Sequence, residues 1–138
     1  MNKITHLEWS PAISVHISKI DDQHKKLFDI TNQLIDAFES GAEDMLTIIS
    51  ELVNYTTVHF HEEQVTMMNY QFPGLTLHTR EHDKFIEQVE EFLKDYDTGN
   101  KDLGYRMVVF LKDWLAAHTS GMDMEYADFV AKKTPKEK

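Results

Sequence analysis

Cysteine is absent from this chain of 138 residues. Without a thiol the protein has no disulfide, thiolate nucleophile, zinc ribbon, Fe–S cluster or thiolate-ligated haem. Any bound metal must therefore be held by histidine, carboxylate or water. Glycine is also scarce, and the five glycines form no Gly-x-Gly motif. This excludes a dinucleotide-binding fingerprint and a phosphate-binding glycine loop.

The chain has fewer basic than acidic residues, and it has no long apolar run. The net charge is −10 at neutral pH and no cluster of Lys and Arg interrupts it, so we expect neither nucleic acid nor an anionic membrane as a partner. The longest purely apolar run, Met107 to Leu111, is too short for a membrane span, and the N-terminus lacks the apolar stretch of a signal peptide. These features predict a soluble, cytoplasmic protein.

Apolar residues recur at three- and four-residue steps in four segments, which is typical of helices with one buried face. The four stripes run from Ile20 to Phe38, Met45 to Met67, Leu75 to Tyr96 and Leu103 to His118. Short connections make sequential helices antiparallel. The sequence therefore predicts an all-α protein, an antiparallel up-down-up-down four-helix bundle in a single domain over 1–138. The arm would cover about 1–18, the bundle about 19–131 and a charged tail 132–138.

Sequence signals also predict where the helices begin and end. Ser18 with Asp21 has the spacing of a capping box for the first helix, and Ser40 with Glu43 has it for the second. The second helix should end before Pro73, because the residue before a proline disfavours the α conformation.

Five of the eight histidines lie on the apolar stripes, and each predicted helix contributes at least one. They are His24, His59, His78, His82 and His118. A lone histidine on such a stripe is typically a core residue bonded to a backbone carbonyl. Five in one core would each need a partner, because an unpaired buried polar group costs roughly 1 to 3 kcal/mol. Metal ions would satisfy all five together.

The spacing of these residues supports metal binding. His78 and His82 stand at i,i+4, so their rings share one helix face and can bind the same ion. His59 and Glu63 repeat this spacing. A carboxylate among buried histidines is either a costly buried charge or a metal ligand, and a cation would compensate it.

Asp123, five residues after His118, is the seventh candidate ligand. In a continuous α-helix it would be rotated by about 140° from His118 and would point elsewhere. We expect instead that Gly121 ends the helix in a left-handed conformation and that the turn brings Asp123 back to the bundle. The alternative is an ordinary solvated turn residue.

Five imidazoles and two carboxylates are too many for one tetrahedral zinc and too rich in nitrogen for calcium or magnesium, whereas two bridged transition ions fit the count. The chain resembles the hemerythrin family, in particular its single-domain bacterial members, over about residues 9–130. The matching motifs are IDDQHKKLF at His24, HFHEE at His59 and Glu63, HTREH at His78 and His82, and WLAAHTSGMD ending in Asp123. Ferritin-like proteins instead use Glu-x-x-His motifs and mostly carboxylate ligands.

The resemblance implies two iron ions in an oxo- or hydroxo-bridged di-iron centre. Its ligands would be His24, His59, Glu63, His78, His82, His118 and Asp123. Glu63 and Asp123 would bridge the irons. One iron would bind only His24 and His59 and keep a position open for dioxygen, and the other three histidines would complete the second iron.

The surroundings of the site also carry expectations. An apolar shell would limit the entry of water, with Phe28, Phe60, Phe85, Phe110 and Trp114 as candidates and ordinary core packing as the alternative for each. Ala116 and Thr119 are smaller or more polar than the family resemblance leads us to expect. Thr119 would either widen the oxygen pocket or donate its hydroxyl to a carbonyl in the last helical turn.

Three histidines serve as internal controls. His61 is about 200° around the helix from His59 and should face solvent. His6 and His16 precede the first predicted helix. We expect all three to be ordinary surface histidines.

The predicted function is reversible dioxygen binding, for oxygen storage or for delivery to an oxygen-consuming enzyme, by a monomer that is not itself an enzyme. One alternative is an oxygen or redox sensor that acts through a separate partner. The other is a di-iron enzyme that reduces peroxide or handles nitric oxide.

Overall fold

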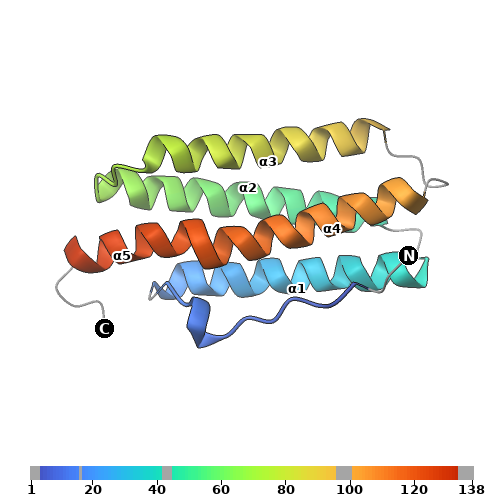
Figure 1. The fold of residues 1–138 in the computed structure, drawn as a ribbon, viewed down its shortest axis with the longest axis horizontal. Helices are drawn as coiled ribbons and strands as arrows, with labels where there is room; N and C mark the ends of the chain where they lie inside the picture. The colour runs from blue at the N-terminus through green and yellow to red at the C-terminus, as the bar shows by residue number, and fades with distance from the viewer. Residues whose placement is uncertain (1–3, 16, 42–44, 96–100, 134–138) are drawn as a thin grey trace.

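Four long helices pack side by side in the computed structural model, which describes residues 4–15, 17–41, 45–95 and 101–133. They are α1 (Ser18–Ser40), α2 (Met45–Asn69), α3 (Leu75–Asp95) and α4 (Lys101–Ala117), which a π-helical turn (His118–Met122) joins to α5 (Asp123–Lys133). Figure 1 shows that successive helices run in opposite directions and that α4 and α5 form one rod. The described residues contain no strand, which confirms the predicted all-α bundle. No described helix is both long and apolar enough to span a bilayer.

The core follows the predicted stripes. The largest buried cluster fills the half of the bundle in which α1 ends and α2 begins, and Leu34, Ile49 and Leu111 are 0% exposed there. Smaller clusters around Ile20 and Met67 fill the opposite half. Buried polar side chains lie between them on α1, α2, α3 and the π-helical turn after α4. The bundle thus encloses one polar layer between two apolar ones.

The capping box predicted at the start of α1 is wrong. The helix begins at Ser18, but its cap residue Ile17 makes no capping hydrogen bond with its side chain. The carboxylate of Asp21 instead accepts hydrogen bonds from the Ser14 hydroxyl at 2.6 Å and from the Val15 backbone N–H at 2.8 Å. The acidic residue is therefore engaged by the segment before the helix, which it ties to the first turn.

The second predicted capping box is also wrong, because Ser40 is the last residue of α1 and not the residue before α2. Gly41 closes α1 in the left-handed conformation (φ 73°), which glycine adopts without strain. Glu43 lies outside the described residues. The predicted end of α2 is confirmed, since the helix stops at Asn69, before Pro73.

The N-terminal segment lies along the outside of α1 and runs opposite to it (Figure 1). The Ile4 N–H donates to the Glu39 carboxylate at 2.9 Å, near the end of the helix. Leu7 exchanges two backbone hydrogen bonds with the Asn32 amide, at 2.8 and 2.9 Å. These bonds hold the segment against the helix that carries His24.

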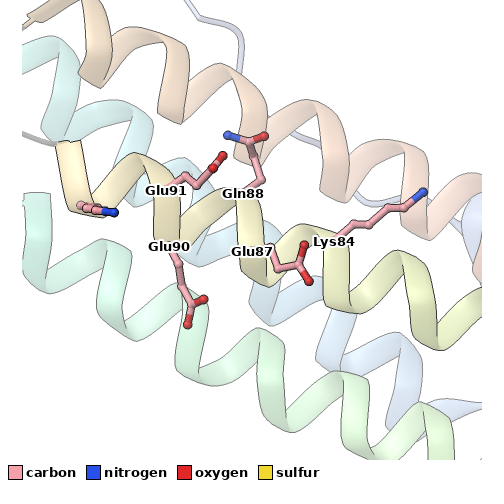
Figure 2. Close-up of a pocket in the computed structure, with 6 residues that line it drawn as sticks. Lys84, Glu87, Gln88, Glu90 and Glu91 are labelled. Carbon is pink, nitrogen blue, oxygen red and sulfur yellow. The ribbon is translucent and has the colours of Figure 1, made fainter.

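A surface depression follows the outer face of α3 (Figure 2). It is lined by Lys84, Glu87, Gln88, Glu90, Glu91 and Lys94. All six come from one helix and are charged or polar, as expected of a solvated face. The histidines of α3, His78 and His82, are buried and do not line it. The candidate site is therefore inside the bundle.

Candidate metal centre

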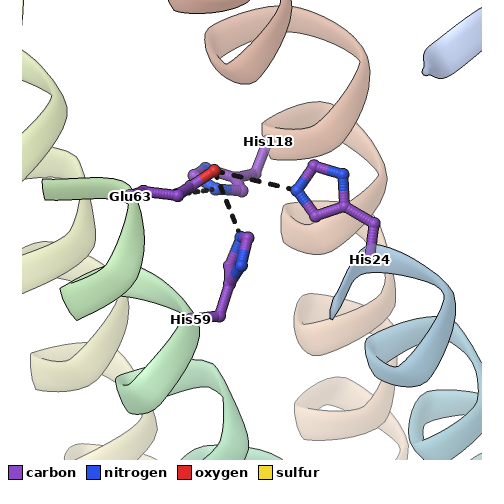
Figure 3. Close-up of side chains that lie close together, drawn as sticks. All are labelled: His24, His59, Glu63 and His118. Atoms are coloured by element: carbon purple, nitrogen blue, oxygen red, sulfur yellow. Dashed lines mark hydrogen bonds and ion pairs between the residues drawn. The ribbon is translucent and has the colours of Figure 1, made fainter. Parts of the chain in front are cut away.

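Six of the seven predicted ligands converge in the polar layer. None of their side chains is more than 3% exposed. They are His24, His59, Glu63, His78, His82 and His118. Figure 3 shows three of these histidines pointing at the Glu63 carboxylate from different helices. Donor atoms of His24, His59, Glu63 and His118 lie within 4.8 Å of one another, and so do those of Glu63, His78, His82 and His118.

Helical spacing brings the two pairs together as predicted. His59 Nε2 lies 3.2 Å from Glu63 Oε2, one turn further along α2. The rings of His78 and His82 on α3 have centroids 4.6 Å apart. Each helix therefore presents its two donor groups on one face, one turn apart.

One oxygen of Glu63 faces two histidines. Glu63 Oε2 lies 3.2 Å from His59 Nε2 and 3.7 Å from His24 Nε2. These two imidazoles come from α1 and α2. They form the two-histidine half of the site.

The other oxygen faces the remaining three histidines. Glu63 Oε1 lies 3.1 Å from His118 Nε2, 3.4 Å from His82 Nε2 and 3.7 Å from His78 Nε2. These imidazoles come from α3 and from the first residue of the π-helical turn. They form the three-histidine half, so one buried carboxylate divides the five histidines into two groups.

The distances suit donors that share a metal ion. Nitrogen and oxygen donors lie about 2.0 to 2.2 Å from a transition ion, so neighbouring donors are about 3 to 3.5 Å apart in octahedral or tetrahedral geometry. The contacts of Glu63 with His59, His82 and His118 fall in this range, at 3.2, 3.4 and 3.1 Å. Imidazole with carboxylate is a donor set that transition ions favour. These donor types and spacings are therefore those of a cluster that could hold transition ions.

Burial keeps the His82 imidazole in the form that binds metal. Its pKa is lowered from 6.5 to about 4, mainly because burial penalises the charged ring. The hydrogen bond to Glu63 opposes this shift, and the nearby His118 adds to it. At neutral pH the His82 ring is uncharged, so one ring nitrogen has a lone pair for a metal.

Two glutamines contact the outer nitrogens of the ligand rings. Gln23 Oε1 lies 2.8 Å from His59 Nδ1, and Gln64 Nε2 lies 3.3 Å from His82 Nδ1. The sequence analysis missed both. Their position in the sequence could have indicated them. Each is adjacent to a predicted ligand, so its side chain is rotated by about 100° around the helix from that ligand, towards the neighbouring helix.

Three of the five aromatic shell candidates, Phe60, Phe85 and Trp114, lie on or next to the three-histidine half. Phe60 stacks on His82, with ring centroids 3.6 Å apart, and Trp114 stacks on His118 at 4.7 Å. Phe85 packs on both, 5.8 Å from Phe60 and 4.4 Å from Trp114. These rings separate the ligands from the apolar core beneath them.

The other two aromatic candidates, Phe110 and Phe28, do not stack on a histidine of the site. Phe110 stacks on Phe85, at 5.8 Å, and so supports the layer that touches the ligands. Phe28 is buried at 4% exposure, one turn after His24 on α1. Phe110 also packs against the main apolar core.

Thr119 donates its hydroxyl back to the preceding helical turn. The acceptors are the Leu115 carbonyl oxygen at 3.0 Å and the Ala116 carbonyl oxygen at 3.3 Å. Thr119 is also 0% exposed. The second of the two expectations for this residue is therefore confirmed.

The helix does not end at Gly121, contrary to the expectation. It passes through the π-helical turn that begins at His118 and continues as α5 from Asp123. A π turn closes from residue i to i+5, one residue more than an α turn. The five-residue step from position 118 to 123 thus corresponds to an i,i+4 step of an α-helix. The Asp123 side chain lies outside the described part of the structure, so its role stays a prediction.

The control histidines agree with expectation where they are described. His61 is exposed on α2. His6 is exposed as well, and its Nε2 lies 2.6 Å from Asp36 Oδ1. His16 lies outside the described residues.

Comparison with known proteins gives one consistent family. The family model described as hemerythrin HHE cation binding domain matches residues 15–130. A bacteriohemerythrin of Clostridium acetobutylicum is 32% identical over 126 residues, covering 87% of this chain and 98% of the relative. One of Pseudomonas aeruginosa is 33% identical over 129 residues, covering 92% and 83%. A hemerythrin-like protein of Naegleria gruberi is 32% identical over 118 residues, covering 86% and 88%. The resemblance indicated by the histidine motifs is therefore confirmed, and the chain belongs to the hemerythrin family.

Proposed function

We propose that this protein binds dioxygen reversibly at a di-iron centre. Its ligands would be His24, His59, Glu63, His78, His82, His118 and Asp123. The observation that carries the proposal is the division of five histidines, two and three, between the two oxygens of Glu63. When bound, the two irons supply the electrons that reversible oxygen binding requires.

In this proposal Glu63 would bridge the two ions. Its carboxylate is 0% exposed and surrounded by imidazoles, so as a charged group it needs cations nearby. One oxygen faces each half of the site, which suits one ion on each side. Asp123 would be the second bridge.

The two halves differ in how many donors the protein supplies. His24 and His59 leave their ion with one imidazole fewer than the ion of the other half has. This difference would leave room for dioxygen at the ion held by His24 and His59. Phe60 and Trp114 stack on the three-histidine side and would limit the entry of water there.

Imidazole dominates the site, which favours a carrier over an oxygen-activating enzyme, since the latter class uses mostly carboxylates. The relatives from Clostridium and Pseudomonas are named bacteriohemerythrins. We therefore infer oxygen storage or delivery to an oxygen-consuming enzyme, by a cytoplasmic monomer. We also propose that 1–138 is a single domain with an arm at about 1–18, a bundle at about 19–131 and a tail at 132–138.

Oxygen titration of the iron-loaded protein tests the proposal. The protein is reduced without oxygen, exposed to a known amount of dioxygen, and then degassed, while optical spectra and iron content are recorded. Full recovery of the reduced spectrum after degassing is the expected result. Steady consumption of oxygen or peroxide in the presence of a reductant would instead indicate an enzyme, and the carrier function would be wrong.

A further inference from the structure

Two glutamines repeat the same arrangement on neighbouring helices. Gln23 comes directly before a histidine of the site on α1, and its Oε1 lies 2.8 Å from Nδ1 of His59 on α2. Gln64 comes directly after Glu63 on α2, and its amide nitrogen Nε2 lies 3.3 Å from Nδ1 of His82 on α3. One of the two contacted rings belongs to the two-histidine half and the other to the three-histidine half.

We propose that Gln23 and Gln64 are positioning residues for the two halves of the metal centre. The amide oxygen of Gln23, and that of Gln64 once its amide is rotated by half a turn, accepts the Nδ1–H of a ligand on the next helix and so directs that ligand's Nε2 to its ion. The proposal rests on the proposed di-iron function. It adds two residues that bind no metal but decide how two of the ligands present themselves.

The chemistry of the imidazole ring requires such a partner. A neutral ring carries one proton, on either nitrogen, and the other nitrogen has the lone pair. With Gln23 Oε1 as the acceptor in the 2.8 Å contact, Nδ1 of His59 carries the proton and Nε2 carries the lone pair. His59 Nε2 is the atom that lies 3.2 Å from Glu63. The ring is therefore set for metal binding before any ion arrives.

Gln64 can do the same for His82. Rotation of its side-chain amide by half a turn exchanges the oxygen and the nitrogen. When Nε2 of His82 binds an ion, Nδ1 carries the proton, and the amide oxygen of Gln64 is then the matching acceptor. The stacked Phe60 ring holds the plane of His82 while this bond sets the rotation within that plane.

A neutral acceptor suits this site better than a charged one. Gln23 is 8% exposed, so a carboxylate there would add a second buried negative charge close to Glu63. Such a charge would also stabilise the more positive, oxidised ions. Glutamine provides the hydrogen bond without this bias towards oxidation.

Substitutions at Gln23 and Gln64 test the proposal with cobalt(II), which is coloured and resists oxidation. Anaerobic titration against a chelator measures the affinity for each of the two ions. Gln23→Leu and Gln64→Leu should each lower the affinity for one of the two ions by about tenfold, the lower end of the usual effect of losing such a hydrogen-bond partner. Gln23→Glu keeps an acceptor, and its negative charge also attracts the cations, so this variant should bind cobalt(II) at least as tightly as the wild type. Gln33→Leu, at an exposed position of the same helix, is the matched control and should change neither ion.

Proton NMR of the cobalt-loaded protein gives a second readout that packing alone would not move. The two variants should each shift a different solvent-exchangeable imidazole N–H signal, and Gln33→Leu should shift none. Unchanged affinities and signals in folded variants would overturn the proposal, as would a Gln23→Glu variant as weak as Gln23→Leu. If Gln23→Leu fails to fold, Gln64→Leu decides the outcome. A wild-type chain that binds no pair of ions would instead contradict the proposed function itself.

Discussion

Trp114 lies parallel to the imidazole of His118, with ring centroids 4.7 Å apart and an interplanar angle of 15°. The indole also contacts Phe85, at 4.4 Å, and Phe60, at 5.5 Å. One side chain thus joins the last histidine of the site to the aromatic residues above the main core. Its loss should affect stability and the metal centre together.

Trp114→Ala should lower the free energy of unfolding by roughly 3 kcal/mol, because it leaves a cavity beneath His118. Trp114→Phe keeps an aromatic ring and should lose less than half as much. Denaturant unfolding of the metal-free proteins measures both values. Equal stability of the alanine variant and the wild type would mean that the stacked indole contributes nothing to the fold.

His82→Ala should reduce the iron content from about two ions per chain, because the site loses a ligand and the remaining buried ligands lose their compensation. His61→Ala is the control, since His61 is exposed on α2. Elemental analysis of both purified variants gives the iron-to-chain ratio. If the two variants retained iron equally well, His82 would not be a ligand.

Sequence periodicity predicted the helices and the buried histidines well, because both depend on one repeat of 3.6 residues. Leu27, His59 and Phe85 are buried on the stripes that predicted them. The capping-box motifs that mark the beginnings of helices were less reliable predictors. Asp21 has the right spacing for a capping box, but the preceding Ser14 competes for its carboxylate.

Other features depend on contacts between helices, which spacing within one helix does not reveal. Gln23 reaches a ligand on another helix, 36 residues away in the sequence. After Ala117 the helix widens into a π-helical turn and then continues as α5 (Figure 1). The presence of Gly121 alone does not indicate whether the helix ends or continues in this way. Gly121 suggested that the helix ends there, because glycine commonly follows the last residue of a helix.

The metal-free protein should lose stability as the pH falls. Burial lowers the pKa of His82 from 6.5 to about 4, so between these values the unfolded chain takes up the proton and the folded chain does not. The free energy of unfolding should therefore decrease from pH 7 to pH 4, with a contribution from His82 on the order of 3 kcal/mol.

Urea unfolding across this pH range, in the presence of a chelator, measures the loss. A metal-free His82→Leu variant lacks the titrating ring and should show a shallower pH dependence than the wild type. Parallel pH dependences would show that His82 is not protonated on unfolding in this range, and would contradict the lowered pKa.

Asp123→Ala should disrupt the bridge between the ions. The π-helical turn supports this prediction, because the register places position 123 one turn from His118. Iron content and the absorption of the oxo bridge should both decrease. Asp128→Ala, at an exposed position of α5, is the matched control. An Asp123→Ala protein with unchanged spectra and oxygen binding would remove this residue from the site.

The final prediction concerns the hydroxyl of Thr119, which donates to the Leu115 carbonyl at 3.0 Å. A hydroxyl engaged in this way does not reach into the oxygen pocket, so Thr119→Val should leave the lifetime of the oxygenated protein within about twofold, while losing about 1 kcal/mol of stability with the hydrogen bond.

Thr119→Ile is the contrasting variant. Thr119 is 0% exposed, so the added methylene has no free space and should destabilise the fold by roughly 1 to 3 kcal/mol. The readout is the decay of the oxygenated spectrum in air at fixed pH and anion concentration, in variants that hold both irons. A much slower decay in Thr119→Val would mean that the hydroxyl does act on bound oxygen, and the assignment of its hydrogen bond to the helix backbone would then be wrong for the loaded protein.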